Sequence, residues 1–293
     1  MILHTEKFLE NWKKILFKLY EYEEYMDFVV VPSLTKVKTL SYMPLLNYSN
    51  RESSDVLDLL ELAKDNNYQI RTLNSNYKNF QESDTVTMRL DISSRDEDYV
   101  FSKIIKSKCR NQIRKSIKNN LHIKVGEEDL LDDFYALFKK TMHRYGTPVF
   151  SKDLFSLILK NVKAKLFIVY KDNKAISSLI LICDEKLSIV PWAASNYEFV
   201  NYCPNHLMYY EAIKYSISQE CDVFDFGRSG YLTSSTYKFK EQWGAKPVKI
   251  DLISSQEQNI YSKYSMASKV WKKLPSNVCS YIGPKLCKFL VDL

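Results

Sequence analysis

The stretch "FDFGRSGYLTSSTYKFKEQWGA", Phe224 to Ala245, decides the fold. It begins as an apolar strand, turns at Gly227 and continues into a short helix that ends before Gly244. Three of the chain's six glycines lie in this stretch. Glycine lets the backbone turn where the Cβ of another residue would clash. We therefore expect the strand to end at Gly227 and the helix to bring Lys240 back towards that end.

The segments around this stretch predict the rest of an α/β unit. Helical spacing marks "EDLLDDFYALFKKTMHRYG" and "KDLFSLILKNV", and strand patterns mark "LFIVYK", "AISSLILIC" and "LSIVPWAAS". The helix "NHLMYYEAIKYSISQ", capped near Asn205, then crosses to "DVFDFG". Such a crossing makes the last two strands parallel, and ligands bind outside the carboxyl ends of neighbouring strands. Those ends are Ser195 and Gly227–Arg228, and the element order matches the GNAT acyltransferase fold.

The first part of the chain has a weaker pattern of the same kind. It predicts a helix over Thr5–Tyr20, strands in "DFVVVPS", "QIRTL" and "TVTMRLDI", and a helix over Glu52–Asn67. We therefore predict an α/β (α+β) fold of mixed sheets flanked by helices. No repeat in the sequence itself relates the two parts, and two GNAT-like domains in tandem are what the family resemblance described below implies. Residues 1–125 would form the N-terminal domain, ending in a basic helix, and residues 126–257 the catalytic domain. Residues 258–293 would form a basic, aromatic tail.

Composition excludes several classes of protein. The 293 residues contain neither a GxGxxG loop nor a Walker P-loop, so a Rossmann dinucleotide site is not expected. The six cysteines form no CxxC pair and the four histidines are scattered, so we expect no metal and no tightly bound cofactor. The net charge of +7 permits an anionic partner. With no signal-peptide pattern and no run of 18 apolar residues, we expect a cytoplasmic protein.

Six motifs give the chain a family resemblance. In order, they are "RNQIRKSIKNNL", "YGTPVF", "PWAASN", "PNHLMYYEAI", "FDFGRS" and "YKFKEQWGA". From about Ser94 to Ile253 the chain resembles the FemAB-like aminoacyl- and acyltransferases of the bacterial cell envelope, and most of all the branch found with exopolysaccharide genes. The resemblance implies a tandem GNAT fold and transfer of an acyl group to an amine.

The resemblance also implies roles for particular residues. FemX-type enzymes have a Phe-Lys pair where this chain has Phe239 and Lys240, and their lysine stabilises the transition state. Two substrate-binding residues of that family fall near Lys152 and Phe155, where this chain has other residue types, which leaves the muropeptide substrate in doubt. Thr147, in "YGTPVF", is expected at the substrate together with Lys152.

The residues themselves support some of these roles and leave alternatives. Lys240 fits because acyl transfer builds negative charge on a carbonyl oxygen, which a fixed cation stabilises. Asp225, inside an apolar strand, must be either a proton acceptor for the amine or a structural ion-pair partner. Arg228 would bind a phosphate or carboxylate, or secure its loop. The other expected substrate contacts, each with core packing or capping as its alternative, are Ser229, Trp192, Ser195, Tyr237 and Asn205.

The helix between the two halves is strongly basic. An apolar stripe of Ile105, Cys109, Ile113 and Ile117 is expected to pack, which leaves a cationic face. Arg110, Arg114 and Lys115 on that face would bind tRNA or another phosphate, unless the face is only solvated. The segment "NYEFVNYCPNH" has no glycine with which to hold the pyrophosphate of CoA, which favours aminoacyl-tRNA over acyl-CoA as the donor.

Three functions follow from these observations. The leading one is transfer of an acyl or aminoacyl group to an amine of a nucleotide- or lipid-linked sugar or peptide, a precursor of the cell envelope or of a polysaccharide. The second is a CoA-dependent amino-sugar N-acetyltransferase. The third is a non-catalytic module that binds RNA or a membrane surface on a degenerate GNAT scaffold. The tail, with Trp271, Tyr281 and its lysines, would allow peripheral contact with the inner membrane.

Overall fold

The computed structural model describes residues 2–25, 28–32, 38–41, 43–46, 48, 67–73, 85–230, 234–254 and 267–290. The chain forms two compact units. Unit 1 contains Met1–Phe8, Thr85–Thr141 and Phe155–Val248, and unit 2 contains Leu9–Asp84, Met142–Leu154 and Lys249–Leu293. The units interleave along the chain, whereas the predicted domains are contiguous. The boundaries at residues 125/126 and 257/258 stay a prediction about homologous halves.

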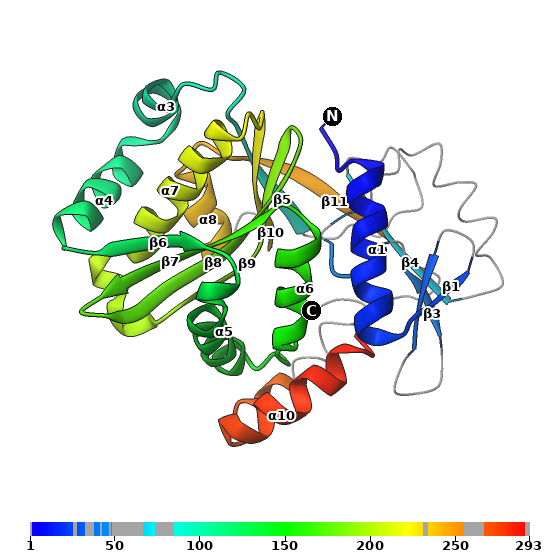
Figure 1. Cartoon of the computed structure of the whole chain (residues 1–293). Coiled ribbons are helices and arrows are strands. Elements are labelled where there is room, and N and C mark those ends of the chain that lie inside the picture. Colours follow the sequence, from blue (N-terminus) through cyan, green and yellow to red (C-terminus); the bar gives the residue numbers. More distant parts are fainter. Residues whose placement is uncertain are drawn as a thin grey trace. The chain divides into compact units, whose positions relative to one another are not determined.

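Unit 1 is built on a mixed sheet whose strands lie in the order β5-β10-β9-β8-β7-β6 (Figure 1). The bounds are β5 Thr85–Asp91, β6 His122–Gly126, β7 Ala164–Lys171, β8 Lys174–Asp184, β9 Leu187–Ser195 and β10 Val223–Gly230. β9 and β10 are parallel, as the crossing helix predicts, and every other neighbouring pair is antiparallel. β6 was not predicted. Ile123 and Val125 alternate with His122 and Lys124, but the strand has only 5 residues and most of its side chains are exposed.

The helices of unit 1 lie on this sheet. They are α4 Ser107–Lys118, α5 Leu131–Tyr145, α6 Lys152–Asn161, α7 Pro204–Ser218 and α8 Ser235–Glu241, with short helical turns at Glu97–Tyr99, Val100–Ile104, Glu128–Leu130 and Tyr197–Tyr202. The end of α5 from residue 142 and the start of α6 up to residue 154 belong to unit 2. α7 lies along β7 and β8, α4 packs on α7, and α8 contacts β10 and β5 (Figure 1). α6 contacts β9 through an edge-to-face pair between Phe155 and Trp192.

The predicted basic helix is broken and its stripe is shorter than expected. The chain is extended at Ile105, between the turn at Val100–Ile104 and α4. Ile105, Cys109 and Ile113 are buried, but Ile117 is 57% exposed. Ser116 occupies the buried position instead, because a spacing of three residues after Ile113 returns to the same face of a helix.

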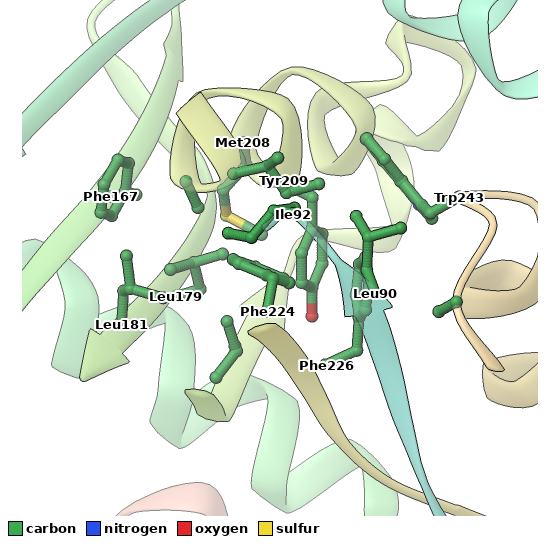
Figure 2. Close-up of a cluster of buried hydrophobic side chains, with 14 of the residues drawn as sticks. Leu90, Ile92, Phe167, Leu179, Leu181, Met208, Tyr209, Phe224, Phe226 and Trp243 are labelled. Carbon is green, nitrogen blue, oxygen red and sulfur yellow. The ribbon is translucent and has the colours of Figure 1, made fainter. Parts of the chain in front are cut away.

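The core of unit 1 joins α7 to the inner face of the sheet. Figure 2 shows Met208 and Tyr209 of α7 beside Leu179 of β8 and Phe224 of β10. Phe226 and Trp243 extend this cluster, and the ring centroids of Tyr209 and Phe226 are 5.3 Å apart. The core therefore reaches the point where β10 leads into α8.

The strands of unit 2 lie in the order β1-β2-β3-β4-β11. The bounds are β1 Glu23–Tyr25, β2 Phe28–Val31, β3 Thr39–Ser41, β4 Asn67–Leu73 and β11 Lys246–Ser254, with helices α1 Glu6–Tyr20 and α10 Ser276–Cys287. Trp12 of α1 is fully buried and its indole N–H donates to the carbonyl of Pro44. The helix predicted over Glu52–Asn67 lies outside the described residues, except for Asn67, which begins β4.

Candidate active site

β9 and β10 separate from each other in the middle of the sheet. Their parallel pairing covers Val223–Leu187, Phe224–Ser188 and Asp225–Ile189 and stops there. Both strands become irregular at this level. The register of β9 against β8 shifts after Ile189, where Pro191 removes a backbone donor, and the register of β10 against β5 shifts between Asp225 and Arg228. The sheet thus opens at the place that the sequence predicts for a ligand.

Gly227 forms the irregularity in β10. Its φ is +77°, in the left-handed region that glycine adopts without a Cβ clash. Its backbone N–H donates to Oδ1 of Asp225 over 2.8 Å. The predicted turn at Gly227 is therefore present, but as a bulge within the strand, because β10 continues to Gly230.

Asp225 is fully buried and lies in a dense hydrogen-bond network. Besides the Gly227 N–H, it accepts from Oγ1 of Thr87 over 2.5 Å and from Nε of Arg89 over 3.0 Å. Arg89 is itself buried and donates from Nη1 to the carbonyl of Ile2. Burial of a carboxylate is favourable when donors and a countercharge surround it. These contacts favour the structural role of Asp225 over the role of proton acceptor.

Lys240 points back to the bulge, as the sequence predicts. Its side chain is only 7% exposed. Nζ donates to the carbonyl of Gly227 over 2.9 Å and to the carbonyl of Arg228 over 2.8 Å. Burial lowers the pKa of Lys240 to about 8, while the negative charge of Asp225 acts in the opposite direction. The result is a nearly buried cation at the level where β9 and β10 have separated.

α8 holds Lys240 in this place. Its N-cap is Ser234, whose hydroxyl accepts from the backbone N–H of Tyr237. Tyr237 is buried on this helix. Phe239 packs edge to face against His206 and Trp243, at centroid distances of 5.3 and 6.2 Å. The structure therefore places Phe239 in an aromatic cluster beside Lys240, and its catalytic role stays a prediction.

His206 belongs to the same aromatic cluster. Its ring stacks on Trp243 at 5.9 Å, and burial lowers the pKa of His206 to about 4. Imidazole is therefore neutral at physiological pH here. Trp243 is completely buried, as a residue of the packed core is.

The other predicted residues of unit 1 lie on the strands that part and on α7. Arg228 is half-buried on β10, while Ser229 is buried and its hydroxyl makes no hydrogen bond to the described residues. Ser195 ends β9, and its carbonyl accepts from Oγ1 of Thr141. Asn205 lies inside α7, not at its cap, which is Cys203. The Asn205 amide oxygen accepts from Oγ of Ser177 over 2.5 Å.

The remaining predicted residues do not join this group. Thr147 and Lys152 belong to unit 2, and their roles stay predictions. Arg110 donates from Nη1 to the carbonyls of Ser102 and Ile105, which ties α4 to the preceding turn. Arg114 lies over the ring of Phe101 at 5.4 Å and Lys115 is exposed. Of the three, Arg114 and Lys115 have the exposure that phosphate binding needs.

Thr87 and Arg89 were missed by sequence reasoning. Both lie on β5, in "TVTMRLDI", where they alternate with the apolar Val86, Met88 and Leu90. A Thr and an Arg on one face of a buried strand indicate a polar partner on the neighbouring strand. That alternation was the available signal, but it does not name Asp225.

The described residues offer neither a metal site nor a helix that could cross a membrane. No cluster of three or more His, Cys, Asp or Glu residues there has the arrangement of a metal site. Likewise, within the described part of the chain no helix combines the length and the apolar character that crossing a bilayer requires.

Comparison with known proteins agrees with this geometry. Residues 107–241 match the acetyltransferase (GNAT) domain family. This matched part of the chain has the GNAT fold. The match runs from the first residue of α4 to the last residue of α8, and so includes the parting strands and Lys240. No curated protein matches the sequence.

Solved structures show the same fold over most of the chain. A crystal structure of FemX is similar with a TM-score of 0.58 at 16% identity, covering 92% of this chain and 94% of that one. A conserved protein of unknown function from Bacteroides thetaiotaomicron VPI-5482 gives 0.58 at 12% identity, covering 85% and 90%. L-PGS from Bacillus licheniformis gives 0.56 at 10% identity, covering 94% and 100%. The predicted mixed α/β fold of GNAT type is confirmed, and the exopolysaccharide branch stays a prediction.

Proposed function

We propose that this protein is an acyltransferase that moves an acyl or aminoacyl group onto an amine of a cell-envelope or polysaccharide precursor. The observation that carries the proposal is the buried ammonium of Lys240, held at the opening between β9 and β10 of a GNAT domain. A fixed cation in a site with little water stabilises developing negative charge more strongly than solvent does.

The geometry of Lys240 suits this role. An ammonium has three N–H groups, and two of them donate to the carbonyls of Gly227 and Arg228. These two bonds fix the direction of the third N–H, which would donate to the carbonyl oxygen of the acyl group. The amine nitrogen attacks that carbonyl carbon, the oxygen becomes negative, and the bond to the donor then breaks. The amine loses a proton and the leaving oxygen or sulfur gains one.

The donor that we favour is aminoacyl-tRNA. The segment before α7, Tyr197–Tyr202 and Cys203, contains no glycine, although glycine is the usual means of bringing a backbone close to a pyrophosphate. Arg114 and Lys115 on α4 supply exposed positive charge for RNA. The acceptor would be a nucleotide- or lipid-linked sugar or peptide that carries a primary amine.

A donor screen tests the proposal. The purified protein is incubated with charged tRNA and, separately, with acyl-CoAs, each with amino-sugar and aminoacyl acceptors, and the products are read by mass spectrometry. Formation of an amide from charged tRNA, lost in Lys240→Met and kept in Lys238→Met, is the expected result. Lys238 is the matched control because it is an exposed lysine on the same helix. Amide formation that survives in Lys240→Met contradicts the role of Lys240.

The match to an acetyltransferase family favours a second candidate, a CoA-dependent N-acetyltransferase of an amino sugar. Binding to the native state raises the melting temperature by mass action. An increase of Tm with acetyl-CoA, together with acetylated product in the screen, would select this candidate. Neither product, with salt-dependent RNA binding only, would select a non-catalytic module.

A further inference from the structure

The end of the chain carries a surface with an unusual charge. Residues 142–149 and 267–290 contain six Lys and Arg residues and neither Asp nor Glu. The basic residues are Arg144, Lys269, Lys272, Lys273, Lys285 and Lys288. All of them belong to unit 2, and all but the half-buried Lys288 are exposed. A surface of one sign over two segments far apart in sequence points to an anionic partner.

Contacts within unit 2 bring these segments together. Oγ of Ser268 donates to the carbonyl of Tyr145 over 3.1 Å, and Nε2 of His143 lies 2.9 Å from the carbonyl oxygen of Leu274. On the other side, Sγ of Cys279 on α10 contacts the carbonyl of Trp271. Residues 267–274 therefore lie between the end of α5 and α10, and the basic residues share one region of the unit.

α10 has two different faces. Cys279, Gly283 and Cys287 recur every four residues and are buried. A Cβ at Gly283 would lie 2.8 Å from the backbone nitrogen of Val149, which shows how closely that face packs. Val278 and Tyr281 lie on the opposite face with Lys285, and all three are exposed. This helix is the red-orange one in Figure 1.

Large apolar side chains are exposed among the cations. Tyr281 is 70% exposed, Val270 57% and Tyr145 55%. Each tyrosine has a cation over its ring, Lys285 over Tyr281 at 4.0 Å and Arg144 over Tyr145 at 5.1 Å. Paired aromatic and basic residues with aliphatic neighbours are typical of segments that lie at the interface of a lipid bilayer.

We propose that this surface, formed by Arg144, Tyr145, Lys269, Val270, Lys272, Lys273, Val278, Tyr281 and Lys285, binds an anionic membrane. Its lysines would meet the phosphates of the headgroups, and Val270, Val278 and Tyr281 would enter the boundary between headgroups and acyl chains. The exposed valines favour a membrane over RNA as the partner. Proteins bind RNA through cations and through stacking on aromatic rings, and an exposed valine contributes to neither.

Vesicle sedimentation tests the proposal with the full chain. Vesicles of pure phosphatidylglycerol are compared with vesicles of pure phosphatidylcholine, and binding to the former is expected to fall when salt is raised from about 0.05 to 0.5 M. Lys269→Gln/Lys272→Gln/Lys273→Gln is expected to weaken that binding on the order of one hundredfold, since each basic residue near the surface contributes about fivefold. Tyr281→Ser is expected to weaken it severalfold at high salt, where charge attraction is screened.

A matched triple variant controls for charge. Lys140→Gln/Lys163→Gln/Lys246→Gln removes three exposed lysines of unit 1 and lowers the net charge equally. It is expected to bind phosphatidylglycerol vesicles as the unchanged protein does. Equal losses in the two triple variants, or equal binding to both lipids, would overturn the proposal. So would loss of tRNA binding in the first variant with vesicle binding unchanged. Since vesicle binding needs no transfer activity, its outcome is independent of the donor screen.

Discussion

The ammonium nitrogen of Lys240 lies 2.9 Å from the carbonyl oxygen of Gly227, the residue that forms the bulge in β10. Gly227 thus bends the strand, and Lys240 donates a hydrogen bond to the carbonyl of Gly227. Asp225 completes the arrangement, because its carboxylate accepts the N–H of the same glycine. The position of the cation therefore depends on the bulge, and the bulge on a buried carboxylate.

The first prediction concerns the charge of Lys240. Lys240→Met is expected to lower kcat about 10²- to 10³-fold, the usual loss when one oxyanion donor is removed. Met has a similar length and needs no partner, so Tm is expected to change by only a few degrees. Lys238→Met, measured alongside, is expected to retain both activity and Tm. A variant at position 240 that turns over normally would exclude the mechanism.

The pH dependence of transfer follows from the pKa of about 8 for Lys240. Above that pH the ammonium loses its proton, so kcat/KM is expected to fall as pH rises through about 8. The fall does not arise from unfolding through this group. The native pKa lies below the unfolded value of 10.5, so between those values the unfolded chain binds more protons and the contribution of Lys240 to stability increases with pH. A pH profile of Lys240→Met should lack the alkaline fall.

Variants of the ion pair between Asp225 and Arg89 distinguish a structural role of Asp225 from a catalytic one. Asp225→Asn is expected to lower the free energy of unfolding by about 3 kcal/mol, because it leaves the buried Arg89 without its countercharge. Arg89→Met should cost a similar amount, and the double variant less than the sum. Urea unfolding measures all three. If Asp225→Asn instead unfolds like the unchanged protein and loses activity, Asp225 is the proton acceptor.

Two glycines near the site offer a matched comparison. Gly227→Ala is expected to cost about 1–2 kcal/mol of stability, because alanine is strained at a φ of +77°. Gly230 lies three residues further on, has no positive φ, and a Cβ there would meet Ser234 Cβ at an ordinary 3.5 Å. Gly230→Ala should therefore change Tm little. Equal losses of stability in the two variants would show that the bulge does not require glycine at position 227, and would contradict this prediction.

Sequence periodicity predicted the main helices and strands from Leu131 to Glu241, including the parallel pair β9 and β10, because each has a clear repeat and a turn at its end. It also predicted that Lys240 returns to the end of the strand. It did not predict the partners of Asp225. Thr87 and Arg89 lie on β5. Only the register of β5 against β10 places Arg89 opposite Asp225 and Thr87 opposite Arg228. Register across so long a separation is set by tertiary packing, which local patterns do not encode.

The separation itself matters while the chain is being made. Arg89 and Asp225 are 136 residues apart. At 5–20 residues per second, a ribosome needs about 7 to 27 s to reach Asp225 after Arg89. During that interval β5 has left the ribosome with its apolar Val86, Met88 and Leu90 and without the strand that covers one of its edges. The edge of β5 that pairs with β10 therefore stays unpaired until the second half of the chain has been made, and an unpaired strand edge favours aggregation.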